Sequence, residues 1–575
     1  MNRIKKAKTP LIGTNLNDSN AGERRMKVPS APAFAAAILA ATLALSATAT
    51  AMAYETDEIP SNRTGGVLIE QKLSNEAAMS MEASSQFPES YSSLDMSYVT
   101  PAKNQSSYNS CIFFAAASAM ETALLKSGFG EYDLSEEYGN YWGALRLDGT
   151  GWQRNRIRDG AYAYTGYGWL TGGGVTLEEE LPYMSRSEQY FEQLPELTPS
   201  FYATGVEFLD RTDGSDKFKA AIMEHGGAAT SFVYNDRCMN TTTSSYYTSG
   251  LSASEINSGA HATFIVGWDD NYSRLNFNAS NRPSSDGAWL VKNSWGAYLD
   301  FFWISYEDAY LTSAMFGYSY AVTDVTQNHS CNELLQIEEY GPMYGMTFSS
   351  PYVDDSSDIT FINTYEFDCV MNTISTVEFT TYITGADYTL YYIPTEHGAP
   401  VNDRSRWTEL GSGTIEERGI QSIEISPFTV PDNFGAIGVN IDTSDPNLPA
   451  AIGCCEWLTV DDGISSTYVF LPNTLENRSF IVSADRLTSL SDYYSDQDDT
   501  YGGNFSIKAV MNVRAGDVDK SGTITVADAI EVQRHIANLS LLDSDTRRYV
   551  ADLNQDETIT VADAISIQRI IANIL

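Results

Sequence analysis

The stretch KNQSSYNSCIFFAAASAMETALLK spans residues 103–126, and the role of Cys111 within it decides how the whole chain is interpreted. From Cys111 to Lys126 the residues are apolar and rich in alanine, which predicts a helix that begins after Ser110 and ends at Gly128. A cysteine in the first turn of a helix is stabilised as a thiolate by the positive end of the helix dipole. Cys111 is therefore either a small buried apolar residue or a nucleophile.

Length and charge narrow the class of protein. With 575 residues, and about 150 residues per domain as a guide, we expect three or four domains. The net charge of -40 repels nucleic acid and anionic membranes, so we expect neither as a partner. Cysteines are too sparse for disulfides to hold an exported chain of this size together. They are Cys111, Cys238, Cys331, Cys369, Cys454 and Cys455.

The N-terminal segment has the order of an export signal. Basic residues are followed by APAFAAAILAATLALSATATAMA at 31–53, which ends in a small-residue cleavage pattern and predicts a signal peptide over residues 1–53. The alternative is an uncleaved membrane anchor, but serine and threonine interrupt the run. Residues 54–86 are rich in Ser and Glu and are interpreted as a linker or short pro-segment. We therefore expect a secreted protein with no membrane span after signal cleavage.

Residues 330–513 have the sequence pattern of β-strands. Short alternating segments separated by turn residues predict an antiparallel β-sandwich. In GAIGVNID, residues 435–442, this alternation places Ile437, Val439 and Ile441 on one face of a strand.

The last sixty residues contain a duplication. ITVADAIEVQRHIAN at 524–538 and ITVADAISIQRIIAN at 559–573 match at 12 of 15 positions. Starting seven residues before each copy, oxygen-bearing residues occupy positions 1, 3, 5, 7, 9 and 12 of a calcium loop. The predicted ligands are Asp517, Asp519, Ser521, Thr523 and Asp528 in the first copy, and Asp552, Asn554, Asp556, Thr558 and Asp563 in the second.

Residues 514–575 resemble dockerin modules. The resemblance implies a small all-α domain with two calcium ions and a cohesin domain of a scaffold protein as its partner. Val526-Ala527 and Val561-Ala562 occupy the positions that meet the cohesin, and the similar copies imply two equivalent binding orientations. Glu557 stands where the loop requires glycine for a sharp turn, so we expect weaker calcium binding in the second loop.

A nucleophilic cysteine needs an imidazole, a group that orients the imidazole, and donors for an oxyanion. His261 lies in the apolar run SGAHATFIVGWDDNY, where a lone histidine is more often part of the core. Asn293 can accept from the imidazole N–H, and Trp295 can shield that bond from water.

The order of Gln105, Cys111, His261 and then Asn293-Ser294-Trp295-Gly296 resembles the papain-like cysteine peptidases. The likeness extends over residues 87 to 320 and implies an α+β peptidase domain at 87–325 that needs no cofactor for catalysis. It implies that Cys111 is the nucleophile and His261 the general acid and base. Asn293 would orient His261, and Gln105 would donate to the oxyanion together with the backbone N–H of Cys111.

Some positions depart from the family pattern. The family has Cys-Gly-Ser before the nucleophile and Trp after it, whereas this chain has Tyr108-Asn109-Ser110 and Ile112. The insertion at 269–287 lengthens the spacing from His261 to Asn293, and loops tolerate such insertions. The Gly-Gly pair of the substrate cleft has two candidate counterparts, so the substrate-binding residues stay unassigned. The candidates are Asp159-Gly160 and Gly172-Gly173-Gly174.

The middle region, through LLQIEEYGPMYGMTF at 334–348 and GGNFSIKAVM at 502–511, resembles the lectin-like β-domain of some bacterial papain-like peptidases. Together the resemblances imply a secreted cysteine endopeptidase that is anchored to a cellulosome scaffold at the bacterial surface. It would hydrolyse peptide bonds through a thiolate acyl-enzyme. The alternative is a catalytically inactive papain-like fold that serves as a binding or inhibitory component of the cellulosome.

Overall fold

The computed structural model describes most of the chain after residue 86. The described residues are 87–143, 160–183, 197–328, 332–338, 341–342, 344–367, 371–458, 478–495, 501–542, 545–554 and 558–572. The predicted signal peptide (1–53), the predicted linker (54–86) and the predicted calcium ligand Asp556 lie outside them. Among the helices that the structure describes, none is both long enough and apolar enough to cross a membrane.

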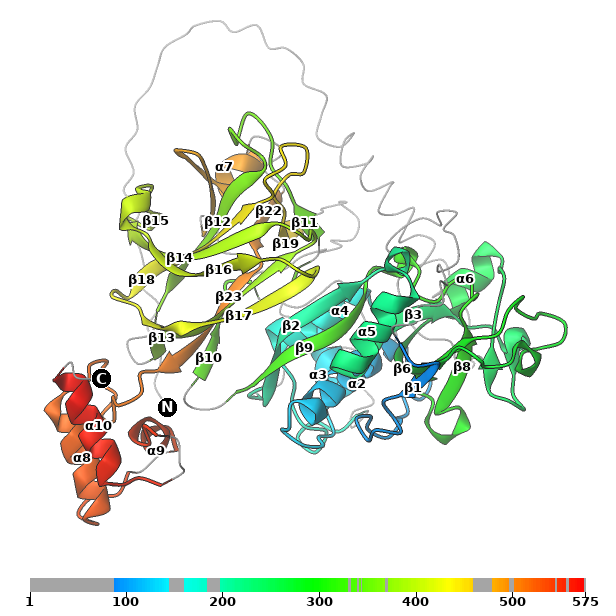
Figure 1. Ribbon diagram of the computed structural model, residues 1–575, viewed down its shortest axis with the longest axis horizontal. Helices are drawn as coiled ribbons and strands as arrows, with labels where there is room; N and C mark the ends of the chain where they lie inside the picture. The colour runs from blue at the N-terminus through cyan, green and yellow to red at the C-terminus, as the bar shows by residue number, and fades with distance from the viewer. Residues whose placement is uncertain are drawn as a thin grey trace, which may run out of the picture. The chain divides into compact units, whose positions relative to one another are not determined.

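The first part of the described chain combines helices with a mostly antiparallel sheet (Figure 1). Its helices are α2 (Cys111–Lys126), α3 (Glu136–Trp142), α4 (Ala163–Gly168), the π-helix η1 (Trp169–Gly173), α5 (Ser215–His225) and α6 (Ala253–Gly259). Its strands are β1 (Ser90–Ser92), β2 (Phe201–Leu209), β3 (Ala228–Val233), β4 (Met239–Asn240), β5 (Ser245–Tyr246), β6 (Ala260–Asp269), β7 (Ala288–Lys292), β8 (Phe301–Ser305) and β9 (Ser319–Gln327).

Helix α2 is the central helix of this part. It is buried from Cys111 to Leu124, as expected for a helix that is apolar on all sides. The predicted start and end are confirmed, since Ser110 is the N-cap residue and Gly128 adopts a positive φ of 81° just beyond Lys126. Ser110, however, makes no capping hydrogen bond through its side chain.

Strand β6 forms the middle of the sheet and lies against α2, although the two are far apart in the sequence. It pairs antiparallel with β3 on one side and with β7 on the other. The pairing with β3 places His261 opposite Phe232. The predicted insertion at 269–287 connects β6 to β7, so the sheet itself is unaffected by its length.

The middle domain consists of antiparallel sheets, as predicted from the alternating sequence. In strand β18, Ile437, Val439 and Ile441 are fully buried in one core, while Ala436 packs into a separate cluster. The elements are β10 (Asn332–Leu335), β11 (Tyr344–Met346), β12 (Asp358–Glu366), β13 (Met371–Thr381), β14 (Asp387–Glu396), β15 (Ala399–Pro400), β16 (Thr408–Thr414), β17 (Gly419–Thr429), β18 (Phe434–Asp442), β19 (Ile452–Leu458), β20 (Ser479–Ser483), β21 (Arg486–Ser489), α7 (Leu490–Ser495), β22 (Tyr501–Phe505) and β23 (Ile507–Val513).

Strand β17 of the middle domain pairs antiparallel with β2 of the first part, at Gly419 and Ile420. The backbone N–H of Phe208 also donates to the carbonyl of Arg418 over 2.9 Å. Arg418 in turn forms an ion pair with Asp213 over 2.5 Å. The ladder of hydrogen bonds therefore continues from one sheet into the other.

The C-terminal part is helical and contains α8 (Val526–Ile536), α9 (Asp545–Ala551) and α10 (Val561–Ile571). Helices α8 and α10 begin with the same capping box, formed by Thr525 with Asp528 and by Thr560 with Asp563. The duplication seen in the sequence is thus repeated in the local structure.

Replacing Ile437 by Ala should destabilise the middle domain by about 2–5 kcal/mol, because it leaves a cavity in a closed apolar core. Scanning calorimetry of the full chain measures this effect. The control is Phe434→Ala on the same strand, because Phe434 is 53% exposed and should tolerate truncation. Equal shifts for the two variants would contradict the assignment of the buried face.

Candidate active site

Cys111 is the first residue of α2, and its side chain is fully buried. The backbone N–H of Ala262 on β6 donates to the Cys111 sulfur over 3.3 Å. Because Ala262 directly follows His261, this contact brings the sulfur to the backbone beside the histidine. Two residues that are 150 positions apart in the sequence are thus neighbours.

The tautomer of His261 follows from its contact with Asn293. The Asn293 side-chain N–H donates to the carbonyl of Leu299 over 2.9 Å, which turns Oδ1 of the amide toward His261. Nε2 of His261 lies 2.8 Å from that oxygen and must therefore carry the proton that it donates. Nδ1 is left with a lone pair, and it makes no hydrogen bond within the described part of the chain.

Aromatic rings enclose the imidazole. Trp295 stacks on it with ring centroids 4.7 Å apart at 23°, and Phe232 approaches edge-on at 5.8 Å. Burial lowers the pKa of His261 to about 4, although the hydrogen bond to Asn293 acts in the opposite direction. At neutral pH the ring is therefore neutral and able to accept a proton.

Gln105 is held at both ends of its amide. Its Nε2 donates to the carbonyl of Tyr108 over 2.6 Å, and its Oε1 accepts from the Ser294 hydroxyl over 2.5 Å. The backbone N–H of Gln105 also donates to the carbonyl of Ser294 over 2.8 Å. An amide NH₂ has two hydrogens, so one of them is available to a further acceptor.

A buried group of charges connects α2 to the two segments that carry Gln105 and Asn293. Glu121 on α2 lies 2.7 Å from Lys103 and 3.7 Å from Lys292. The Lys292 ammonium also donates to the Thr100 hydroxyl over 2.8 Å, and that hydroxyl donates to Glu121. Lys103 also contacts Glu136 on α3 over 3.0 Å.

The charges of this group stabilise one another. Burial alone would raise the pKa of Glu121, but Lys103 and Lys292 together bring it below its usual value. Burial would lower the pKa of Lys103, but the carboxylates of Glu136 and Glu121 raise it. Burial raises the pKa of Glu136 to about 8 despite the neighbouring lysine. Glu121 is therefore the carboxylate that stays ionised at neutral pH.

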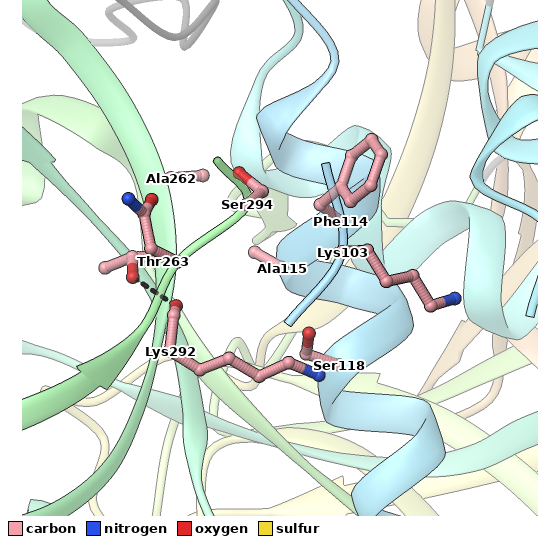
Figure 2. A pocket seen from close by; sticks show the side chains of 9 residues that line it. Lys103, Phe114, Ala115, Ser118, Ala262, Thr263, Lys292 and Ser294 are labelled. Carbon is pink, nitrogen blue, oxygen red and sulfur yellow. Dashed lines mark hydrogen bonds between the residues drawn. The ribbon is translucent and has the colours of Figure 1, made fainter. Parts of the chain in front are cut away.

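Figure 2 shows a small pocket between α2 and the strands. Phe114, Ala115 and Ser118 line it from the helix, and Ala262 and Thr263 line it from β6. Lys103, Lys292, Asn293 and Ser294 complete the lining. The pocket therefore adjoins both the orienting amide and the buried charges.

The first acidic loop at the C-terminus gathers carboxylates. Oxygens of Asp517, Asp519 and Asp528 all lie within 4.8 Å of one another. Asp517 accepts backbone N–H groups from Ser521 and Gly522 over 2.9 and 2.7 Å, and Gly522 has the positive φ of 83° that a sharp turn requires. Three carboxylates in a tight loop suit a hard cation such as calcium, so the residues fit this ion.

The other predicted ligands lie around the same two loops. In the first loop the Ser521 hydroxyl donates to the carbonyl of Thr523 over 3.1 Å. In the second loop Asp552, Asn554, Thr558 and Asp563 are described, whereas Asp556 and Glu557 are not. Asp563 accepts from the backbone N–H of Leu553 over 3.0 Å, so its carboxylate faces the loop.

Comparison with known proteins identifies the family. The model of the papain family of cysteine proteases matches residues 87–301. A solved structure of a cysteine-to-alanine variant of the clostridial cysteine protease Cwp84 after propeptide cleavage is 30% identical, with a TM-score of 0.62, and the match covers 74% of this chain and 99% of that one. The chain belongs to the papain family of cysteine proteases.

A second solved structure contains the cysteine protease and lectin-like domains of Cwp84, a surface layer associated protein of Clostridium difficile. It is 28% identical with a TM-score of 0.63, and the match covers 78% of this chain and 93% of that one. The model of the dockerin type I domain matches residues 515–572. The protein is therefore a cysteine peptidase with a lectin-like β-domain and a C-terminal dockerin.

The structure brings the four residues predicted for the papain-family site into one connected set. Cys111 and His261 meet at β6, His261 contacts Asn293, and Ser294 bridges to Gln105. Their catalytic roles remain a prediction.

The structure describes the two glycine candidates for the substrate cleft to different extents. Within the Gly172-Gly173-Gly174 candidate, a Cβ atom at Gly173 would collide with Trp142, so close packing accounts for Gly173. In the other candidate, Asp159 lies outside the described residues and Gly160 is buried just before α4.

The ion pairs of Glu121 with Lys103 and Lys292 were not predicted from the sequence. A signal for them existed, because Glu121 is the one acidic residue of the apolar run from Cys111 to Lys126. A carboxylate in such a run requires a buried cation. Lys103 and Lys292 could not be chosen as that cation from their positions in the sequence, which are 18 residues before and 171 residues after Glu121.

Glu121→Gln should lower the free energy of unfolding by about 3–5 kcal/mol, because it removes the carboxylate that the buried Lys292 shares with the half-buried Lys103. The folded-state pKa of Glu121 is lowered, so this difference from wild type should be complete above pH 4.5 and should shrink as the pH falls below it. Chemical denaturation at a series of pH values tests both statements.

The matched control is Glu396→Gln. Glu396 pairs with Arg406 over 2.6 Å on an exposed surface, and exposed pairs contribute little to stability. A destabilisation of Glu121→Gln that persists unchanged in acid would show that the effect is steric and not electrostatic.

Proposed function

We propose that the protein is a secreted cysteine endopeptidase that forms a thiolate acyl-enzyme and is held on a cohesin-bearing scaffold by its dockerin. The observation that carries the proposal is the placement of Cys111. Its sulfur lies at the N-terminus of a buried helix and contacts the backbone beside His261, whose unprotonated nitrogen can accept the thiol proton.

The geometry supports one sequence of steps. Nδ1 of His261 takes the proton of Cys111, and the thiolate attacks the carbonyl carbon of a peptide bond. The backbone N–H of Cys111 and the available N–H of Gln105 stabilise the resulting oxyanion. His261 then returns the proton to the leaving amine, which departs as the carbon–nitrogen bond breaks. Water hydrolyses the thioester, releasing the acid and restoring the thiol.

Access to the sulfur sets a further condition. Cys111 and His261 are both fully buried, so a peptide substrate must gain access to them before hydrolysis. We propose that residues 54–86 are a pro-segment that is removed before the enzyme works. The relative whose structure was determined after propeptide cleavage supports this proposal.

In this proposal the dockerin determines where the enzyme is located and takes no part in peptide hydrolysis. We propose that its two loops each hold one calcium ion and that a cohesin of a cellulosome scaffold is its partner. Export through the predicted signal peptide would place the enzyme outside the cell, and a relative that is associated with a surface layer supports that location. No cofactor takes part in the proposed peptide hydrolysis.

After limited proteolysis has removed the residues before Phe87, the wild type should hydrolyse casein. The Cys111→Ala variant, treated in the same way, should not. Iodoacetamide should alkylate Cys111 in the wild type at mildly acidic pH, where a thiol with a pKa of about 8.5 hardly reacts. The two measurements are a casein assay under reducing conditions and mass spectrometry of the labelled peptide.

The control for labelling is Cys238, a second buried thiol that lies outside the site. Hydrolysis that survives in Cys111→Ala would refute the mechanism. A wild type without hydrolysis, in which Cys111 reacts no faster than Cys238, would favour the alternative of an inactive binding or inhibitory component.

Calcium titration of the EDTA-treated full chain by isothermal calorimetry should show two ions per chain. Asp528→Ala and Asp563→Ala should each remove one ion, because each deletes the carboxylate at position 12 of one loop. Removal of calcium should also abolish cohesin binding. A chain that binds no calcium, or that binds cohesin equally well in EDTA, would contradict the proposal.

A further inference from the structure

Tyr183 places its hydroxyl between the two segments that supply the proposed oxyanion donors. The hydroxyl oxygen lies 2.6 Å from the hydroxyl of Ser110 and 3.0 Å from the backbone carbonyl of Gln105. Ser110 directly precedes Cys111, whose backbone N–H is one donor, and Gln105 carries the other. One side chain therefore contacts both segments.

The direction of these two hydrogen bonds is determined by the groups involved. A backbone carbonyl can only accept, so the single proton of the Tyr183 hydroxyl goes to Gln105. The hydroxyl of Ser110 must then donate to Tyr183. The result is a directed chain of hydrogen bonds from Ser110 through Tyr183 to Gln105.

The behaviour of Ser110 as an N-cap residue provides a second observation. An N-cap serine normally accepts from a backbone N–H of the first helical turn, as Ser135 does at α3 and Ser252 does at α6. Ser110 makes no such bond at α2, and its side chain is fully buried. Its hydroxyl bonds to Tyr183 instead, so helix α2 lacks the side-chain cap that α3 and α6 have.

The ring of Tyr183 is fixed in its place. It packs edge-on against Phe114 of α2 with ring centroids 4.9 Å apart, and its backbone N–H donates to Glu178 over 2.7 Å. The hydroxyl therefore sits on an anchored ring and can hold the two segments at a constant separation.

We propose that Tyr183 is a positioning residue that sets the distance between the two oxyanion donors. Its hydroxyl contacts the two segments that carry these donors, so its effect falls on the oxyanion. The proposal rests on the thiol mechanism proposed above. It assigns a role to Tyr183, a residue that the sequence alone did not single out.

Tyr183→Phe tests the proposal, because it retains the ring and its packing on Phe114 while it removes the hydroxyl. We expect kcat/KM for a peptide substrate to fall by roughly tenfold, less than the 10²–10³ lost when an oxyanion donor is deleted outright. Affinity for a peptide aldehyde should fall in parallel, because its hemithioacetal oxygen occupies the oxyanion position. The rate of alkylation of Cys111 by iodoacetamide should not change.

Ser110→Ala interrupts the same chain of hydrogen bonds at its other end. It should reproduce the loss of aldehyde affinity, and the double variant should be no weaker than the single ones, since both remove one shared interaction. The control is Tyr272→Phe. The Tyr272 hydroxyl lies 2.7 Å from the hydroxyl of Ser245 and donates to the carbonyl of Thr243 over 3.3 Å, an equivalent arrangement outside the site.

Two results would overturn the inference while the wild type is active. Tyr183→Phe could keep wild-type kcat/KM and aldehyde affinity, which would show that the hydroxyl positions nothing. Alkylation could slow as much as hydrolysis, which would show a general loss of the site. A wild type that neither hydrolyses peptides nor alkylates at Cys111 would instead refute the thiol mechanism itself.

Discussion

The contact between the start of helix α2 and strand β6 is the constraint on which the rest of this structure depends. The backbone N–H of Ala262 donates to the sulfur of Cys111, so the first residue of α2 lies beside the strand that carries His261. Because α2 is apolar on all sides, it is stable only when the sheet and the other helices cover it. The contacts that bury the helix are therefore the same contacts that bring Cys111 beside His261.

Buried charges fix how the helix lies in that contact. Apolar packing alone tolerates small rotations and shifts, whereas an ionised carboxylate in the interior must meet its cations or pay the cost of desolvation. Glu121 meets Lys103 and Lys292, which lie two residues before Gln105 and one residue before Asn293. The charges thereby align the two segments that carry Gln105 and Asn293 with the helix that carries the sulfur.

The other two modules serve different purposes. The lectin-like β-domain joins the peptidase through the pairing of β17 with β2, which extends one hydrogen-bonded ladder across both. The dockerin has its own small core and two duplicated helices, each preceded by an acidic loop. Chemistry resides in the papain-family domain, whereas the dockerin is the module that we propose determines, through a cohesin, where that chemistry takes place.

The sequence by itself predicted several of the elements and singled out the candidate reactive groups. The apolar run after Ser110 predicted α2, the alternation at Ile437, Val439 and Ile441 predicted the buried face of β18, and the repeat predicted the two capped helices. These features are local, since periodicity and capping depend on residues within a few positions of one another.

Only the tertiary structure decided which distant groups meet. The lysine partners of Glu121, the amide orientation of Asn293 and the diversion of the Ser110 hydroxyl to Tyr183 depend on contacts between residues far apart in the chain. A hydroxyl or a carboxylate in a sequence shows what it can bind, but folding selects its partner. The physical reason is that a buried polar group must be satisfied by whichever group the packing places beside it.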